Sequence, residues 1–437
     1  MVVTPWGRSE SLRARRLRPG PGTPRDEVTR NQRERLFGAM VASVAERGYE
    51  ATRVADLVDL SGISSRSFYN LFPDKRACFL AAMEAVIEMA VNFAASSVTE
   101  PGSWEERARS GFDVFAAMIV AQPAAARMCL VDSYVAGPEV LEPLERAVGG
   151  FEWLTRETLG QSPERAGMPS EMITAHIGAM QEIARTRLRR GTHGKLPALM
   201  DQLWDFMLTF RPPPAPLRQT GRSPSPQPER LDGHDQAERV LRAFAAVVAE
   251  QGYANATIDQ VVKRASISAT TFYAHFEGKE DALMAAIDSG MAQMVAATVP
   301  AYRRAANWPE GIRAAFGAMF SYLASSPAFA RLLAVEVYAA GPAAVERRSQ
   351  AVKPLEALGT GVMESSPETP RIALEAIAGG VYALAYRQVR DKGPEFLPAL
   401  APLCTYITLV PFIGAEEACR VANGDGRGGR RSQARGS

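Results

Sequence analysis

The stretch that decides the fold is residues 61–75, SGISSRSFYNLFPDK, which recurs as residues 265–279, ASISATTFYAHFEGK. The match extends further at the same offset of 204, because Trp104 pairs with Trp308 and Gly137-Pro138 with Gly341-Pro342. It runs without a gap from about residue 34 to residue 138. Such a period exceeds the 20–50 residues of solenoid repeats, so the sequence indicates a whole domain duplicated and fused.

Each copy predicts an all-helical fold. Apolar residues recur at i, i+3, i+4 and i+7, as in the series Leu36, Met40 and Val44. A short helix follows, and after a tight turn Ser64, or Ser268 in the second copy, is placed to cap another short helix. Two short helices joined by a turn of three or four residues predict a helix-turn-helix.

Composition and charge restrict the protein class. The formal net charge of the 437 residues is +2, but both ends are rich in arginine together with glycine, proline or serine. These ends are read as disordered basic arms; a solvated tail and a DNA-touching arm both stay open. The four cysteines are far apart and indicate a reducing cytoplasm without a disulfide framework or zinc site.

No catalytic pattern groups in the sequence. The four histidines are scattered, and phosphate-loop, nucleophile-elbow and zinc-protease motifs are missing. We therefore expect no enzyme, no cofactor and no metal. We also expect no secretory signal and no apolar run of the ~18 residues that a membrane span needs.

A proline-rich linker separates the copies, and proline favours extended chain there. The expected organisation is a disordered basic arm (1–27), a helix-turn-helix domain (28–84), a helical regulatory domain (85–211), the linker (212–232), a second helix-turn-helix domain (233–288), a second regulatory domain (289–418) and a disordered basic tail (419–437).

The helix-turn-helix segments resemble the N-terminal domain of TetR-type transcriptional regulators. The resemblance rests on Gly-Tyr at 48–49 and 252–253, on the helix starts at Ser64 and Ser268, and on Phe-Tyr, Phe and Lys in residues 68–75 and 272–279. It implies two tandem TetR-like units, each with a three-helix DNA-binding domain and a helical ligand-binding and dimerisation domain. Leu71 departs from the family pattern, where the second copy keeps His275.

The resemblance also implies which residues touch DNA. The second short helix would enter the major groove, and lysines that open the next helix would meet phosphates. The implied set is Thr52, Ser64, Ser65, Arg66, Ser67, Tyr69, Asn70 and Lys75 in the first copy, and Thr257, Ser268, Ala269, Thr270, Thr271, Tyr273, His275 and Lys279 in the second. For Arg66, guanine and a phosphate stay open as alternative contacts.

The second half of each copy would hold a small apolar effector and pair the copies. Aromatic and methionine stripes that could line a pocket, or serve only as core, are Phe112, Phe115, Met118, Met128 and Tyr134, then Phe316, Met319, Phe320, Tyr322 and Tyr338. Long helices over 170–190, 196–210, 370–391 and 396–413 carry small residues that permit close approach. We expect an intramolecular pseudo-dimer, with higher oligomers open.

The sequence thus predicts a cytoplasmic repressor that binds a double-stranded DNA operator and is released by a small apolar ligand, with no membrane partner. The alternative is a ligand-sensing or partner-binding protein in which one helix-turn-helix has lost DNA binding; Leu71 and Arg66 in the first copy raise it. These patterns do not encode the identity of the operator or the effector. Activation in place of repression also stays open, because it depends on where the operator lies relative to a promoter.

Overall fold

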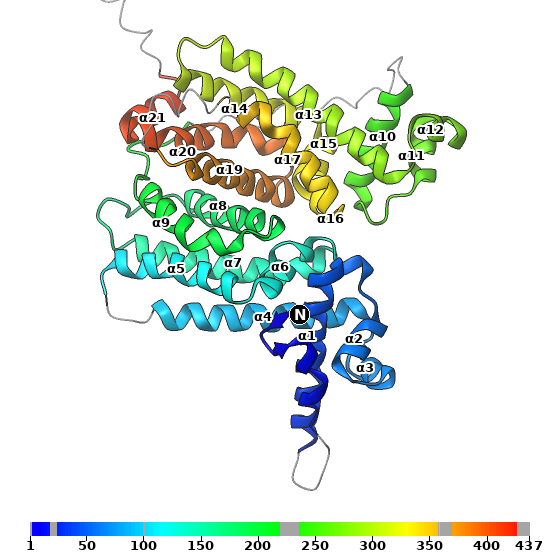
Figure 1. The fold of residues 1–437 in the computed structure, drawn as a ribbon. Helices are drawn as coiled ribbons and strands as arrows, with labels where there is room; N and C mark the ends of the chain where they lie inside the picture. Colours follow the sequence, from blue (N-terminus) through cyan, green and yellow to red (C-terminus); the bar gives the residue numbers. More distant parts are fainter. Residues whose placement is uncertain are drawn as a thin grey trace, which may run out of the picture. The chain divides into compact units, whose positions relative to one another are not determined.

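The computed structural model describes residues 2–17, 24–98, 102–218, 236–356, 358 and 369–425. Contacts divide the chain into two compact units, Met1–Ser162 with Met180–Trp204, and Pro163–Ala179 with Asp205–Ser437. Helices dominate both units (Figure 1), so the predicted all-helical fold is confirmed.

The units do not coincide with the sequence copies. Residues 163–179 and 205–211 belong to the first copy by sequence, but they pack within the second unit. The division falls inside two helices, α8 (Ser170–Arg189) and α9 (Leu196–Met207). The boundary expected at residue 211 is therefore not where the compact units separate.

The first unit combines a small hairpin, two short helices that form a helix-turn-helix and a set of longer helices. In chain order these are β1 (Val3–Thr4), β2 (Gly7–Arg8), η1 (Ser9–Ser11), η2 (Arg13–Arg15), α1 (Arg25–Ala51), α2 (Val54–Ser61), α3 (Ser65–Leu71), α4 (Lys75–Val98), α5 (Trp104–Ala121), α6 (Pro123–Leu130), η3 (Asp132–Tyr134), α7 (Pro138–Leu159) and η4 (His193–Lys195), with parts of α8 and α9.

One apolar core holds α1 to α4 together. Leu57 of α2, Phe68 of α3 and Phe79 of α4 are fully buried against the face of α1 that includes Leu36 and Met40. Gly48 has a φ of 79° and breaks the helical path of α1 shortly before its end. The aromatic and aliphatic periodicity of the sequence thus produces the predicted three-helix domain.

The N-terminal arm differs from its predicted disorder over residues 2–17. Strands β1 and β2 pair antiparallel, and the segment lies against α1 (Figure 1). Leu12 is fully buried in the core around α1, and the Trp6 and Phe37 ring centroids are 5.3 Å apart. Apolar side chains spaced through the arginines provide the burial that orders the segment. Residues 18–23 lie outside the described residues.

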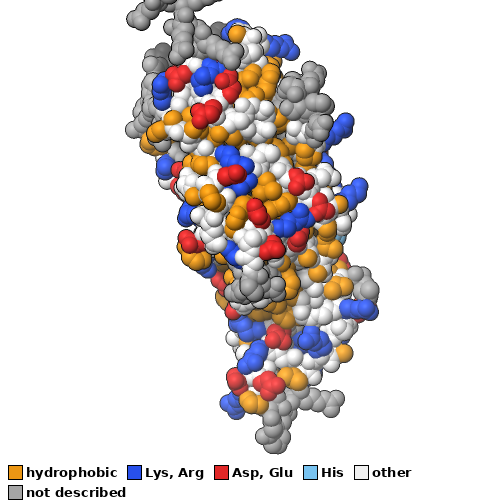
Figure 2. All heavy atoms as spheres, turned by 90° about the vertical axis from the view of Figure 1, so that its left-hand side faces the viewer, with side chains coloured by type: hydrophobic (Ala, Val, Ile, Leu, Met, Phe, Trp, Pro, Cys, Tyr) orange, Lys and Arg blue, Asp and Glu red, His pale blue; other side chains and the backbone are white. Residues whose placement is uncertain are grey.

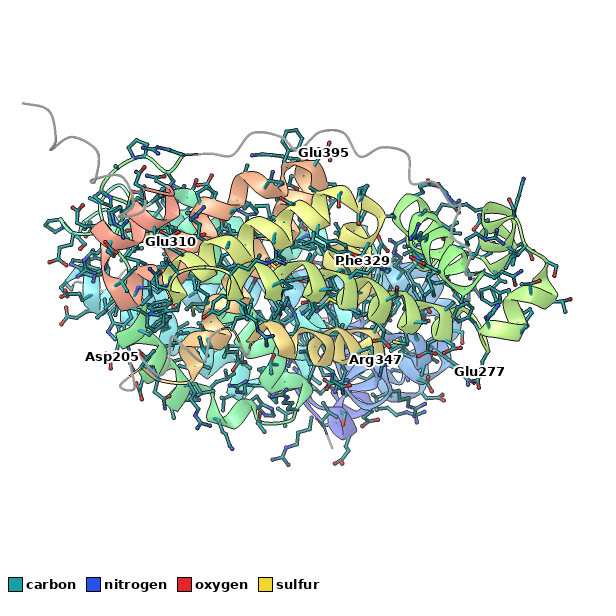
Figure 3. All side chains as sticks on the ribbon, turned by 90° about the horizontal axis from the view of Figure 1, so that it is seen from above. Asp205, Glu277, Glu310, Phe329, Arg347 and Glu395 are labelled. Atoms are coloured by element: carbon teal, nitrogen blue, oxygen red, sulfur yellow. The ribbon has the colours of Figure 1, made fainter. Side chains whose placement is uncertain are left out.

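The second unit repeats the plan. It contains α10 (Gln236–Gln251), α11 (Ile258–Ala265), α12 (Ala269–His275), α13 (Lys279–Arg303), α14 (Trp308–Ser325), α15 (Pro327–Arg331), η5 (Leu332–Glu336), α16 (Val337–Ala339), α17 (Pro342–Glu356), α19 (Ile372–Asp391), η7 (Pro394–Leu400), α20 (Ala401–Ile413) and α21 (Ala415–Ala422). Phe329 of α15 packs edge-on to Tyr322, and Arg347 of α17 pairs with Asp288 of α13 at 2.7 Å (Figure 3).

Small residues let α8 and α19 approach closely within the second unit. A Cβ added to Gly178 would lie 2.1 Å from the Ala383 Cβ, and one added to Gly380 would lie 2.9 Å from the Ala175 carbonyl oxygen. The Arg387 guanidinium donates to the Thr174 hydroxyl across the same contact at 2.8 Å. The close approach expected from these small residues is therefore present.

The C-terminal tail also begins later than predicted. Cys419 lies in α21 and is buried, so residues 419–422 are helical, and the described chain continues to residue 425. Residues 426–437 and the linker residues 219–235 lie outside the described residues. The described start of the linker is tied down, because Asn423 donates its side-chain amide to the Pro216 carbonyl at 3.2 Å.

Three helical stretches are long and apolar enough to cross a membrane by length and composition, Lys75–Ser96, Lys279–Arg303 and Pro394–Ile413. Charged or polar residues such as Glu84, Asp288 and Thr405 interrupt these stretches, so none of them is an uninterrupted apolar run. In Pro394–Ile413, 67% of the apolar window is buried inside the protein. The apolar side chains of this stretch thus form part of the core of the second unit.

Basic and acidic side chains are interleaved on the face shown in Figure 2.

Candidate nucleic-acid interface

Helix α3 presents a polar surface because its apolar side is fixed in the core. The Ser64 hydroxyl accepts from the Ser67 backbone N–H at 3.1 Å and caps the helix, as the sequence predicts. Phe68 is fully buried and anchors the helix from below. The outward positions, Ser65, Arg66, Tyr69 and Asn70, are exposed.

Helix α12 repeats this geometry with different chemistry. The Ser268 hydroxyl accepts from the Thr271 N–H at 3.1 Å, and Phe272 is fully buried. Tyr273 is 58% exposed, the same value as Tyr69. The other outward positions are Ala269, Thr270, Ala274 and His275. The two helices therefore share a scaffold and differ in the groups they could offer to base edges.

A buried arginine sets the position of the turn before α3. The Arg35 guanidinium of α1 donates to the Ser61 carbonyl at 2.8 Å and is only 3% exposed. Burial lowers the pKa of Arg35, with a smaller contribution from Arg16. The sequence pattern did not identify this residue, since an arginine in an apolar helix reads as a surface position.

The two candidate phosphate-binding lysines are held by tyrosine rings. The Lys75 ammonium lies 4.2 Å from the Tyr49 ring centroid and donates to the Tyr49 carbonyl at 2.9 Å. Lys279 lies 4.3 Å from the Tyr253 ring centroid. Burial lowers the pKa of both lysines. Each lysine thus fastens the start of one helix to the end of another, a structural role that the repeated tyrosine–lysine spacing signals; their contact with phosphate stays a prediction.

The two threonines of the predicted set behave differently. Thr52 is 1% exposed, and its hydroxyl donates to the Gly48 carbonyl at 2.8 Å. Its predicted contact with DNA is therefore wrong, because the hydroxyl is buried and already bonded. Thr257 is exposed and caps α11, where its hydroxyl accepts from the Gln260 backbone N–H at 3.4 Å. Of the two, only Thr257 remains available.

Leu71, where the family pattern expects histidine, packs against the core of the first helix-turn-helix. His275 is exposed at the matching position. The scaffold of α3 is intact in spite of this exchange, so the difference changes surface chemistry alone.

The predicted pocket residues serve largely as packing groups. Met128 and Phe320 are fully buried, and Phe112 stands edge-on to Trp204 with ring centroids 5.5 Å apart. The Tyr134 hydroxyl accepts from Arg185 at 2.9 Å, and that of Tyr322 donates to the Gly290 carbonyl at 3.2 Å. Phe115, Met118, Phe316 and Met319 are half-buried, whereas Tyr338 is 4% exposed.

The structure describes a small apolar pocket elsewhere, in the second unit. Residues of α8, α9, α19 and α20 line it, among them Met172, His176, Phe206 and Ile377. None of the residues predicted to line a pocket belongs to it. Burial lowers the pKa of His176 to about 4, so its ring is neutral at physiological pH. The closely packed small residues form part of this wall.

A carboxylate connects the second regulatory core to its helix-turn-helix. Glu336 closes the π-helix η5 and accepts from the Tyr253 backbone N–H at 2.9 Å. The pKa of Glu336 is raised, because the effect of burial exceeds the lowering by that hydrogen bond and by Arg331. The matching residue of the first copy is the shorter Asp132, which lies 3.4 Å from the Arg127 guanidinium instead. The sequence signal was an acidic residue at the same repeat position, which was not recognised.

The chain was compared with protein-family models, curated proteins and solved structures. The family model for bacterial regulatory proteins of the tetR family matches twice, at residues 39–82 and 240–287. A comparison with curated proteins found no match.

Among similar solved structures is FadR, a fatty acid degradation regulator from Bacillus halodurans, with 20% identity over 42% of this chain and 97% of that chain and a TM-score of 0.38. FadR from Bacillus subtilis in complex with stearoyl-CoA gives 20% identity over 40% of this chain and 98% of that chain, with a TM-score of 0.36. A TetR-like transcriptional regulator from Rhodococcus sp. RHA1 has 18% identity over 43% of this chain and 100% of that chain, with a TM-score of 0.37. All three TM-scores are below 0.5, so these likenesses carry no argument about this chain.

The two matches of the family model fall on the two helix-turn-helix domains, α1 to α4 and α10 to α13. Each match includes the capped helix and its buried phenylalanine. The chain therefore contains two helix-turn-helix domains that match the model of the tetR family of bacterial regulatory proteins, which is consistent with two TetR-like units.

Proposed function

We propose that this protein is a transcriptional repressor that binds a double-stranded DNA operator through both helix-turn-helices. The observation that carries the proposal is the pair of capped helices, α3 and α12, each anchored by a buried phenylalanine and each with an exposed polar surface. A helix of this kind reads base edges with the residues near its N-terminus. Arg66 forms no ion pair among the described residues, so its guanidinium is free for guanine or a phosphate.

The two helices would read different half-sites. Arg66 and Asn70 of α3 can form paired hydrogen bonds with guanine and adenine, respectively. Thr270 and the alanines of α12 are suited to the methyl group of thymine. We call the helix-turn-helix that contains α3 the first head and the one that contains α12 the second head. Perfect inverted symmetry of an operator comes from two identical heads, so we expect an operator without it.

Pairing of the two copies within one chain would set the half-site spacing. The close contact of α8 with α19 supports this, because α8 comes from the first copy and α19 from the second. A second support is the Tyr406 hydroxyl of α20, which donates to the Arg211 carbonyl at 2.9 Å. One chain would then occupy two half-sites about 34–36 Å apart.

A small apolar ligand would release the operator. Support comes from a continuous set of contacts in the second unit: the Tyr382 hydroxyl of α19 donates to the Ala334 carbonyl in η5, and Glu336 of η5 holds the Tyr253 N–H. A π-helical turn is an irregular element that can rearrange. A ligand that moved α19 would therefore shift the start of the second helix-turn-helix.

Selection of bound DNA from a random pool tests the proposal. The variants are Arg66→Ala with Tyr69→Ala in the first head, and Thr270→Ala with Tyr273→Ala in the second; all four side chains point outward, so the fold should hold. We expect the wild type to enrich two half-sites and each variant to lose one of them.

The outcomes separate the alternatives. No enrichment by the wild type would contradict DNA binding altogether. Loss of enrichment in only one of the two variants would favour the ligand-sensing or partner-binding alternative with one inactive head. Light scattering gives the stoichiometry: two chains on one minimal operator would contradict the intramolecular pairing.

A further inference from the structure

The folded N-terminal segment, residues 2–17, carries a concentration of unpaired positive charge. It contains Arg8, Arg13, Arg15 and Arg16 against Glu10, a net charge of +3 from four arginines and one glutamate. All four arginines are exposed. None of them pairs with a carboxylate in the part of the chain that the structure describes. Their charge is therefore directed to solvent or to a partner.

Specific contacts fix this segment beside the first reading head. Leu12 fits against Gly38 of α1, where an added Cβ would lie 2.7 Å from the Leu12 Cδ2. The aliphatic stem of Arg13 covers Gly62, where an added Cβ would lie 2.5 Å from the Arg13 Cγ. The Asn31 side-chain amide donates to the Arg15 carbonyl at 3.1 Å. These contacts hold the arginines in place and remove part of the entropy that ordering a loose arm on DNA would cost.

Arg13 lies close to α3, the helix that would enter the major groove. Gly62 ends α2 and lies three residues before Ser65, the first residue of α3. Three residues span at most about 11 Å of chain. When α3 lies in the major groove, the DNA therefore passes close to the Arg13 side chain. The duplex carries one phosphate per ~1.7 Å of its axis, so phosphates lie near this arginine.

The second head lacks the means to hold such a segment. At the repeat offset of 204, Gly38 becomes Arg242 and Gly62 becomes Ser266. Arg242 pairs with Glu238 on the surface of α10. Side chains thus occupy both places where the first head admits Leu12 and Arg13.

We propose that residues 2–17 form a preformed DNA-backbone contact that belongs to the first head alone. This rests on the proposed operator binding and adds a second, unshared contact to one half-site. The first head then has a longer footprint and a larger share of the salt-dependent affinity, and the operator is bound with a fixed orientation.

The test compares two pairs of exposed arginines. Arg13→Gln with Arg16→Gln removes two charges from the segment, including the one beside the turn before α3. Arg303→Gln with Arg304→Gln is the matched control, because it removes the same charge from the far end of α13, a helix of 25 residues that begins at Lys279. Affinity for the selected operator is measured by fluorescence anisotropy between 50 and 200 mM salt.

We expect the slope of log K against log salt to become shallower by ~0.9 for each lost phosphate contact, thus by up to ~2 in the segment variant and by nothing in the control. Two lost contacts correspond to a 4^1.8, or about 12-fold, smaller salt-dependent change across this range. Hydroxyl-radical footprinting should show protection that shrinks at one half-site only.

A further variant checks that docking matters. Leu12→Asp places a carboxylate at a fully buried position and should release the segment. Its slope should fall in the same direction, while circular dichroism should keep the helical signal of the other helices. Equal slopes in the segment variant and the control, with a wild type that binds its operator, would overturn this inference alone. A wild type without operator binding would overturn the proposed function as well.

Discussion

The contact between α8 and α19 predicts opposite effects for two identical substitutions. Alanine normally stabilises a helix by ~1 kcal/mol relative to glycine. At Gly178 the new methyl group would lie 2.1 Å from the Ala383 Cβ, whereas carbon atoms in contact need about 3.5–4.0 Å. The helices would have to separate by ~1.4–1.9 Å, and such overpacking costs ~1–3 kcal/mol. The difference between this cost and the propensity gain is a net destabilisation of the second unit of up to ~2 kcal/mol for Gly178→Ala.

Gly317→Ala is the matched control in the same unit. Gly317 lies inside α14, and an added Cβ would meet nothing within 4 Å. This substitution keeps the propensity gain and should stabilise by up to ~1 kcal/mol.

Calorimetry of the full chain measures both effects. A change of 1 kcal/mol shifts Tm by ~2–4 °C for a unit of about 150–250 residues. We expect Tm to fall by up to ~8 °C for Gly178→Ala and to rise for Gly317→Ala. A Gly178→Ala protein that melts as high as the control would refute the close approach of the two helices.

Three further outcomes follow from single residues. Arg66→Ala should weaken operator binding by ~1–3 kcal/mol and relax selection in one half-site, as measured by sequencing of bound pools. Burial raises the pKa of Asp132 to about 6, so between about pH 4 and pH 6 the folded state holds a proton that the unfolded state has lost. The free energy of unfolding should therefore fall by at most ~3 kcal/mol as the pH rises through that window. Urea titrations should show this fall in the wild type and its absence in Asp132→Asn. Ser266 has a φ of 54° where the first copy has glycine, so Ser266→Gly should raise the free energy of unfolding by ~0.5–1 kcal/mol in the same assay.

The helical fold and the reading helices followed from the sequence because their signals are local. Period-3.6 apolar faces, capping serines and glycines at helix ends act between residues a few positions apart. The duplication gave each signal twice, and a shared pattern such as that around Phe68 and Phe272 is far less ambiguous than one copy of it. For the same reason the helices of the second half, including α8 and α19, were recognised from their apolar spacing and small residues.

Other features depended on which surfaces meet in three dimensions. The arginine-rich segment at the N-terminus resembles a disordered tail in composition, but Leu12 finds a buried place against a glycine 26 positions away. Thr52 is polar and precedes a helix, as a DNA-contacting residue would, but its hydroxyl is turned inward to a carbonyl. Composition counts residues and does not report the burial of each one.

The sequence by itself determined that the protein is two helical copies, each with a helix-turn-helix whose second helix is capped by a serine. Only the tertiary structure decided that Lys75 lies on a tyrosine ring, that Glu336 links η5 to the second head, and that residues 163–179 pack with the second copy. The physical reason is range. Helix propensity and capping act within about one turn, whereas burial, ring stacking and carboxylate hydrogen bonds form between residues that only the complete fold brings within a few ångströms.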